Sequence, residues 1–336
     1  MPIPIILAGA ALAAGAFGVK KGVDAYNDNT RASDLQTEAR QLFEGAQQQL
    51  ELSRTQTSET LDELGKLKLE VWEKQLGRFV QLFGQLKNVE LEGGAELGTL
   101  KAFTPEELAE MSSISLRASE VLTGGVTALG AGALAGMAAY GGAFMLGTTA
   151  TTGTAIASLS GVAATNATLA WLGGGALTAG GLGMAGGMAV LGGLVAGPAL
   201  AIAGALFAAK AEENLANARK ILAEAKMAKG QIDSAMGVLR AIDRLARDYH
   251  QAILQLEGRM SQVLDRLQAL IQSNGNNYAK FDEQHRKVVH LSLQFAQSMK
   301  MLLETPLLTR EGEVAPNAKR DLEESHNERL ALVATV

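Results

Sequence analysis

The residue types that carry most enzyme chemistry are scarce and scattered in this chain. It has no cysteine and four histidines, His250, His285, His290 and His326. None belongs to a His-Glu-x-x-His pair, and His285 and His290 are five residues apart, which places them on different faces of a helix. We therefore expect each histidine to be solvated or hydrogen-bonded inside the protein, and we predict no metal site.

Glycine is abundant, with 38 residues, but it does not form a phosphate-binding pattern. The sequence lacks Gly-x-x-x-x-Gly-Lys-Ser/Thr, and no cation lies among the central glycines to meet a phosphate. No arrangement of Ser, His and Asp indicates a catalytic triad. A net charge of -5 gives no general attraction to nucleic acid. We predict a protein that is not an enzyme, with no catalytic, cofactor-binding or metal-binding residues and no nucleic-acid partner.

The most informative feature is a long segment without ionisable side chains. Residues 121–209 contain no Asp, Glu, Lys, Arg or His over 89 positions. Because a helix that faces water needs a polar face, such a segment indicates lipid or complete enclosure by protein. At about 20 residues per crossing it has room for two to four membrane helices. We expect spans at 122–147 and 153–172 and one or two more within 176–209.

Small residues four positions apart recur in this uncharged block and would let helix backbones approach closely in a bilayer. So many glycines also produce this spacing by chance, which is the alternative to a packing role. Trp171 marks either a membrane interface or an ordinary core contact. The predicted membrane-packing residues are Gly132, Gly136, Gly183, Gly187, Gly193, Gly197 and Trp171.

Two charge-rich helical arms flank the block, at 22–92 and 210–304. In the second arm, apolar residues alternate steps of three and four over more than five heptads, which is typical of a coiled coil. The arms could pair antiparallel with each other, or each could pair in a homo-oligomer. The main seam residues are Ile232, Leu239, Ile242, Tyr249, Ile253, Leu256, Met260, Val263, Leu267 and Leu270.

The remaining segments are shorter. We expect an apolar helix at 1–21 that crosses the membrane, is buried in the protein or lies at the membrane surface. We also expect a linker with a short helix at 93–120 that starts at a Thr104 and Glu107 capping box. Asn and Gly at 273–277 predict a break in the second arm. We interpret 305–336, which contains Pro316, as a flexible tail. The predicted fold class is all-α.

The order of arm, uncharged hairpin and arm resembles that of α-helical pore-forming toxins. The small-residue hairpin is also similar to those of apolipoprotein L-type proteins and type III secretion translocators. The resemblance rests on architecture over residues 31–304 and implies a glycine-zipper hairpin that is sheltered in one state and exposed on meeting a membrane. The N-terminal apolar segment departs from a simple toxin.

We therefore expect a non-enzymatic, membrane-inserting helical protein, with pore formation as one form of that activity. The alternative is a permanently membrane-anchored coiled-coil scaffold that recruits a membrane-remodelling partner. A third reading is a water-soluble helical oligomer with the block as its core. The expected partners are a lipid bilayer and a second copy or another helical protein. The expected location is a bacterial inner membrane, or the cytoplasm with conditional insertion.

Overall fold

The computed structural model describes four stretches of the chain and three single residues between them. These are residues 18–89, 103–124, 134, 138, 139, 215–309 and 314–333. Within them the regular elements are all helices, apart from two isolated bridges that join Lys87 to Asn277 and Leu308 to Val314. The predicted all-α class is therefore confirmed.

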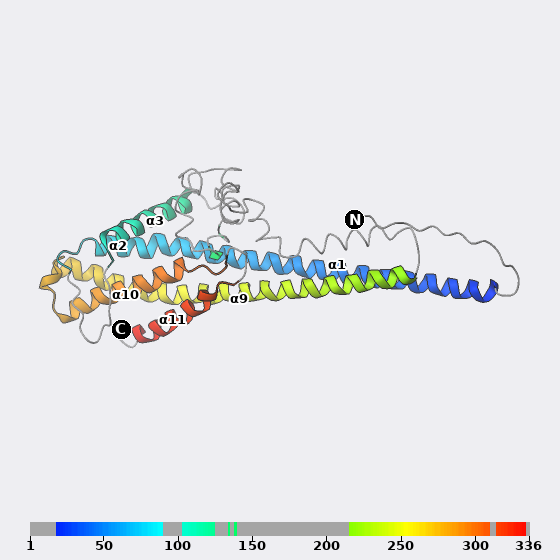
Figure 1. Ribbon diagram of the computed structural model, residues 1–336. Coiled ribbons are helices and arrows are strands. Elements are labelled where there is room, and N and C mark those ends of the chain that lie inside the picture. The colour runs from blue at the N-terminus through cyan, green and yellow to red at the C-terminus, as the bar shows by residue number, and fades with distance from the viewer. Residues whose placement is uncertain are drawn as a thin grey trace. The chain divides into compact units, whose positions relative to one another are not determined.

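Eight helical elements are described, and Figure 1 labels the longer ones. Three α-helices and one π-helical turn begin before the uncharged block, and four helical elements follow it. In chain order they are α1 (Gly18–Val71), η1 (Trp72–Leu76), α2 (Gly77–Phe83), α3 (Pro105–Gly124), α9 (Leu215–Asn274), η6 (Tyr278–Lys280), α10 (Glu283–Glu304) and α11 (Pro316–Val333).

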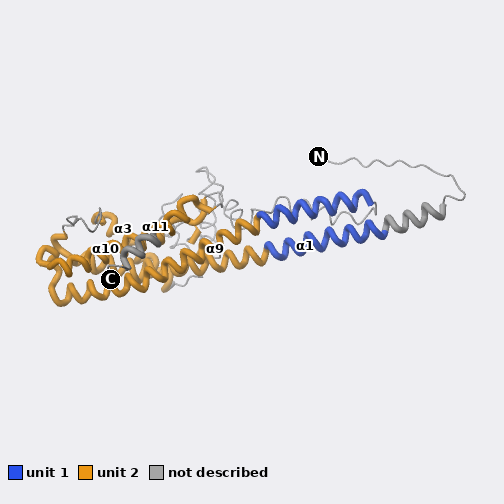
Figure 2. The backbone as a smooth tube through the Cα atoms, turned by 90° about the horizontal axis from the view of Figure 1, so that it is seen from below, with its two compact units in different colours: residues 1–50, 195–234 blue, residues 51–194, 235–336 orange. Residues whose placement is uncertain are grey.

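The chain divides into two compact units, coloured separately in Figure 2. The first comprises residues 1–50 and 195–234. Its described part pairs the beginning of α1 with the beginning of α9 through a small apolar cluster, supported by a surface ion pair of 3.8 Å between Glu38 and Lys226. The cluster consists of Ala39, Ile221, Leu222 and Ala225, with Leu35 and Leu42 packed against it.

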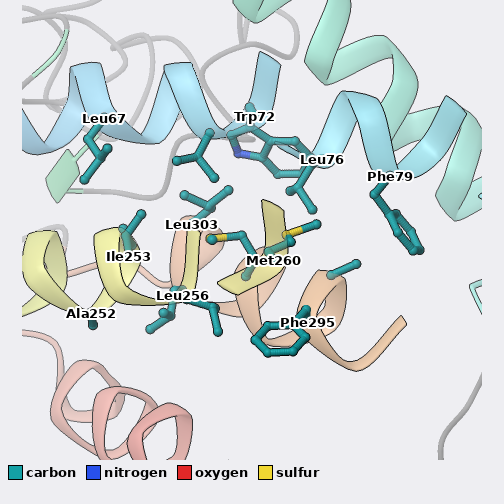
Figure 3. Close-up of a cluster of buried hydrophobic side chains, with 14 of the residues drawn as sticks. Leu67, Trp72, Leu76, Phe79, Ala252, Ile253, Leu256, Met260, Phe295 and Leu303 are labelled. Atoms are coloured by element: carbon teal, nitrogen blue, oxygen red, sulfur yellow. The ribbon is translucent and has the colours of Figure 1, made fainter. Parts of the chain in front are cut away.

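The second unit, residues 51–194 and 235–336, holds the main hydrophobic core. In Figure 3, Trp72 and Leu76 from η1 face Met260 of α9 and Leu303 of α10. Full burial of such side chains contributes about 1.5–3 kcal/mol each before the entropy cost of ordering them. This core positions every feature discussed below.

The predicted seam of α9 is almost entirely inside the protein: Leu239 is half-buried and the other nine seam residues are buried. The buried face is wider than that seam, because Met236, Leu245, Ala252 and Leu264 are buried too. A two-stranded coiled coil buries a narrow stripe. In the second unit α9 packs against α10 and α11 in addition to α1, so a broader face of α9 is buried.

Two predicted segment boundaries differ from the structure. The boundary between 1–21 and 22–92 falls inside α1, which already runs from Gly18. The first arm does not extend to residue 92, since α2 ends at Phe83. The backbone at Lys87 then pairs with the turn after α9: Lys87 N–H donates to Asn276 over 2.8 Å, and Tyr278 N–H donates to Lys87 over 3.0 Å. This pairing needs non-helical backbone.

The prediction of a flexible tail at 305–336 is wrong for most of that segment. Helix α11 occupies Pro316–Val333, and Ala318 within it is fully buried. Proline is compatible with the first turn of a helix, because the N–H that it lacks has no partner there in any case. Pro316 therefore starts a helix and does not mark a flexible segment.

Two predicted local signals are confirmed. Thr104 and Glu107 form the reciprocal capping box of α3: Glu107 N–H donates to Thr104 Oγ1 over 3.2 Å, and Thr104 N–H donates to Glu107 Oε2 over 2.7 Å. The second arm breaks where Asn and Gly cluster, with α9 ending at Asn274 and Gly275 at φ +77°. Asp282 then caps α10 by accepting from His285 N–H over 2.8 Å.

Candidate functional site

The unusual chemical feature of the second unit is a buried lysine. Lys68 lies near the end of α1 and is fully buried. Its Nζ donates long hydrogen bonds to the carbonyl oxygens of Thr305, at 3.4 Å, and Ala138, at 3.5 Å. It also lies 5.9 Å from the ring centre of Tyr249. No carboxylate among the described residues pairs with this amine.

Burial controls the charge of this amine. Removal from water lowers the pKa of Lys68 from 10.5 to about 7. Burial first, and the charge of Asp321 second, raise the pKa of the Tyr249 phenol, so this group stays neutral. The Tyr249 hydroxyl donates to the carbonyl of Ala318 over 2.7 Å. Near neutral pH the site thus holds an amine that is shared between its charged and neutral forms.

The C-terminal helices brace one of the two carbonyls that Lys68 contacts. Thr305 directly follows α10, and its Oγ1 bonds to the Met301 carbonyl over 2.8 Å and to Asp321 Oδ2 over 3.2 Å. Asp321 also accepts from the Asn317 amide over 3.3 Å. These contacts join α10 and α11 beside the amine and hold the Thr305 backbone in place.

The other carbonyl belongs to the uncharged block. Ala138 and Ala139 are buried in the core of the second unit. The Ala139 oxygen accepts two backbone hydrogen bonds, from Leu307 N–H at 2.7 Å and from Leu308 N–H at 2.9 Å. These donors follow Pro306, where α10 has ended and its N–H groups need partners outside a helix. The block is therefore bound to the body through its backbone at this point.

A glycine on α1 makes room for the same segment. Gly65 is buried one turn before Lys68, and its Cα lies against the backbone of Leu134. A methyl group at Gly65 would overlap the Leu134 carbonyl oxygen and lie 2.6 Å from the carbonyl carbon. Any larger residue at position 65 must therefore displace residue 134, because backbone atoms cannot rotate away. By contrast, Gly258 on α9 has no atom within 4 Å of the position that a Cβ would take.

A second candidate feature is the π-helical turn η1. It makes close contact with α3, where Ser119 Oγ donates to Glu73 Oε1 over 2.8 Å and Ser115 Oγ donates to the Glu73 carbonyl over 3.4 Å. A groove of about 550 Å³ lies beside this contact, lined by Glu73, Arg78, Ser112 and Leu116 among others. Because π-helical turns occur often at functional sites, the groove is of interest. Its mixed charges do not indicate a particular ligand.

The histidines do not form a site among the described residues. His290 is buried, and its Nε2 lies 2.8 Å from the hydroxyl of Tyr278. Burial first and Arg286 second lower the pKa of His290, so the ring is neutral at neutral pH. His285 lies 3.1 Å from its capping partner Asp282. Over the described ranges, no group of three or more His, Asp or Glu side chains could hold a metal ion.

Most of the predicted membrane-related residues lie outside the described part of the chain. This holds for all seven predicted membrane-packing residues: Gly132, Gly136, Gly183, Gly187, Gly193, Gly197 and Trp171. The expected spans 153–172 and 176–209 lie outside it too. Among the helices that the structure does describe, none is both long and apolar enough to cross a membrane.

The sequence carries a signal for Lys68 that the initial interpretation missed. Leu61, Leu64, Lys68 and Val71 follow one another in steps of three, four and three, so the lysine occupies a seam position of the first arm. A charged residue at such a position is expected to be buried or to face a special partner. Gly65 gave no comparable signal, because its role depends on a backbone 69 residues further along the chain.

Comparisons with known proteins assign no family to this chain. No family model, no curated protein and no solved structure matches this chain.

Proposed function

We propose that this chain is a non-enzymatic helical protein that inserts its uncharged block, residues 121–209, into a lipid bilayer. The helices before and after the block form the body from which insertion starts. The observation that carries the proposal is the absence of any ionisable side chain over 89 consecutive positions. A surface of that composition in water would be a large exposed apolar patch, which proteins reserve for contact with lipid or protein.

The few described members of the block support a sheltered state. Val121, Ala138 and Ala139 are buried in the same core as α1, α9 and α10. These contacts come from small side chains and from backbone hydrogen bonds, with little large apolar surface. Segments rich in Ala and Gly lie close to the threshold for insertion, so modest interactions are enough to decide between protein and lipid.

Vesicle binding and leakage test this proposal directly. The purified full-length chain is mixed with liposomes of neutral lipid, or of neutral and anionic lipid, that contain a self-quenched dye. We expect the protein to float with the vesicles in a density gradient and to resist extraction by alkaline carbonate. Failure to associate with either kind of vesicle, at any ratio of protein to lipid, would overturn the proposal.

Dye release then separates two kinds of membrane protein. Leakage that rises steeply with protein concentration supports pore formation by an oligomer. Carbonate-resistant binding without leakage supports the alternative, a membrane-anchored scaffold whose charged helices recruit a partner.

A further inference from the structure

The contact between the uncharged block and the body has the geometry of a closure. Leu134 lies against Gly65, the Ala138 carbonyl faces the amine of Lys68, and the Ala139 carbonyl accepts from Leu307 and Leu308. Three separate interactions thus hold the described residues Leu134, Ala138 and Ala139 on α1 and on the chain after α10. All of them lie in one compact unit.

The interactions in this contact are of kinds that allow it to open and close. Two backbone hydrogen bonds to one carbonyl exchange readily for bonds to water or to a peptide of another segment, with a small net change in free energy. The glycine gives a close fit without adding an apolar side chain to the interface. The amine beneath the segment gains solvation when the contact opens, because in the closed form no described carboxylate neutralises it.

We propose that this contact is a latch: it keeps Leu134, Ala138 and Ala139 on the helical body, and its opening makes the uncharged block available to lipid. The claim that opening makes the block available to lipid rests on the proposed function. The claim that the contact opens and closes concerns the protein alone, in the absence of lipid. The closed latch covers Lys68, and the open latch exposes it.

Gly65→Ala is the variant that opens the latch. Alanine has the higher helix propensity, so a weaker α1 cannot explain a loss of the contact. Gly258→Ala is the matched control, since it makes the same change in a helix of the same unit with open space around the new methyl group. Gly65→Ser is a second variant with a slightly larger side chain. All three are expected to keep the far-UV circular dichroism of the parent chain.

Labelling of lysines with an amine-reactive ester, read by mass spectrometry, reports the state of the latch without lipid. Lys66 is exposed and only two residues from Lys68, so it serves as the internal reference. A clash of this size in a packed site shifts the opening equilibrium by roughly tenfold or more. We expect the Lys68 to Lys66 labelling ratio to rise by about that factor in Gly65→Ala and to stay at the parent value in Gly258→Ala.

The same variants are then tested for flotation with liposomes. A higher Lys68 labelling ratio together with stronger vesicle binding in Gly65→Ala and Gly65→Ser supports the latch. An unchanged labelling ratio in both variants overturns it, whatever the vesicles show. A higher ratio with vesicle binding equal to the parent overturns the controlling role of the latch but leaves the proposed function intact. A higher labelling ratio without vesicle binding by the parent or by any variant overturns the proposed function. It also overturns the claim that the latch controls access to lipid.

Discussion

At the scale of single residues, Lys68 sets a dependence of stability on pH. Its pKa is about 7 in the folded protein and 10.5 in the unfolded chain. Below pH 7 both states are protonated, so this residue produces no slope. Between pH 7 and 10.5 the unfolded chain binds one more proton, and the free energy of unfolding rises with pH, by about 1.4 kcal/mol per pH unit. The nearby phenol of Tyr249 stays protonated in the folded protein over this window, because burial raises its pKa.

Lys68→Met tests this dependence. Methionine has a similar length and cannot bind a proton, so the rise in stability between pH 7 and pH 9 should be smaller than in the parent chain by about 2 kcal/mol or more. The measurement is urea unfolding followed by circular dichroism at several pH values. Lys66→Met, which removes an exposed lysine from the same turn, is the control and should keep the parent slope. Equal slopes for Lys68→Met and the parent would show that the amine is solvated.

At the scale of elements, the start of α3 depends on its capping box. The Thr104 side chain satisfies the Glu107 N–H, and the Glu107 carboxylate satisfies the Thr104 N–H. Thr104→Ala should lower the free energy of unfolding of the second unit by about 1 kcal/mol, since it leaves a helix donor without its partner. Chemical unfolding and hydrogen exchange in the first turn of α3 measure the effect.

The last turn of the same helix offers a matched control. Thr123 Oγ1 donates back to the Ser119 carbonyl over 2.8 Å, inside the helix, and caps nothing. Thr123→Ala should therefore change stability by a few tenths of a kcal/mol at most, because alanine has the higher helix propensity. A cost at Thr123 as large as that at Thr104 would mean that α3 is held by something other than its cap.

At the scale of the whole molecule, a charge placed in the uncharged block should weaken vesicle binding and leave the stability of the helical body unchanged. A carboxylate in the middle of a membrane segment costs about 2.5–3.5 kcal/mol on insertion. Val162→Asp combined with Leu194→Asp should thus reduce vesicle binding by at least tenfold. The conservative pair Val162→Leu and Leu194→Ile should bind as the parent does.

Unfolding measurements complete that test. The described main core is formed by α1, η1, α2, α9, α10 and their neighbours. We expect the aspartate pair to leave the urea midpoint of this core unchanged. A loss of helix content in the aspartate pair would point to the third interpretation, in which the block is an internal core that never leaves the protein.

The features that the amino-acid sequence predicted correctly are those that local chemistry decides. Helix formation, the capping box at Thr104 and the break after Asn274 depend on residues within one or two turns of each other. The burial of the apolar repeat in α9 follows the same logic, because a repeat of three and four residues defines one face of a helix, whereas the coiled coil itself stays a prediction.

The latch and the tail depend on distant residues. Lys68 meets Ala138 and Thr305, 70 and 237 positions along the chain, and Gly65 meets Leu134. Whether a lysine is solvated, a glycine is needed or α11 docks at Ala318 is decided by what packs there, and no local preference encodes it. By itself the sequence determined where charge is absent, where α3 starts and where α9 ends. Only the tertiary structure decided which backbone covers the buried amine, because burial is a property of the assembled core.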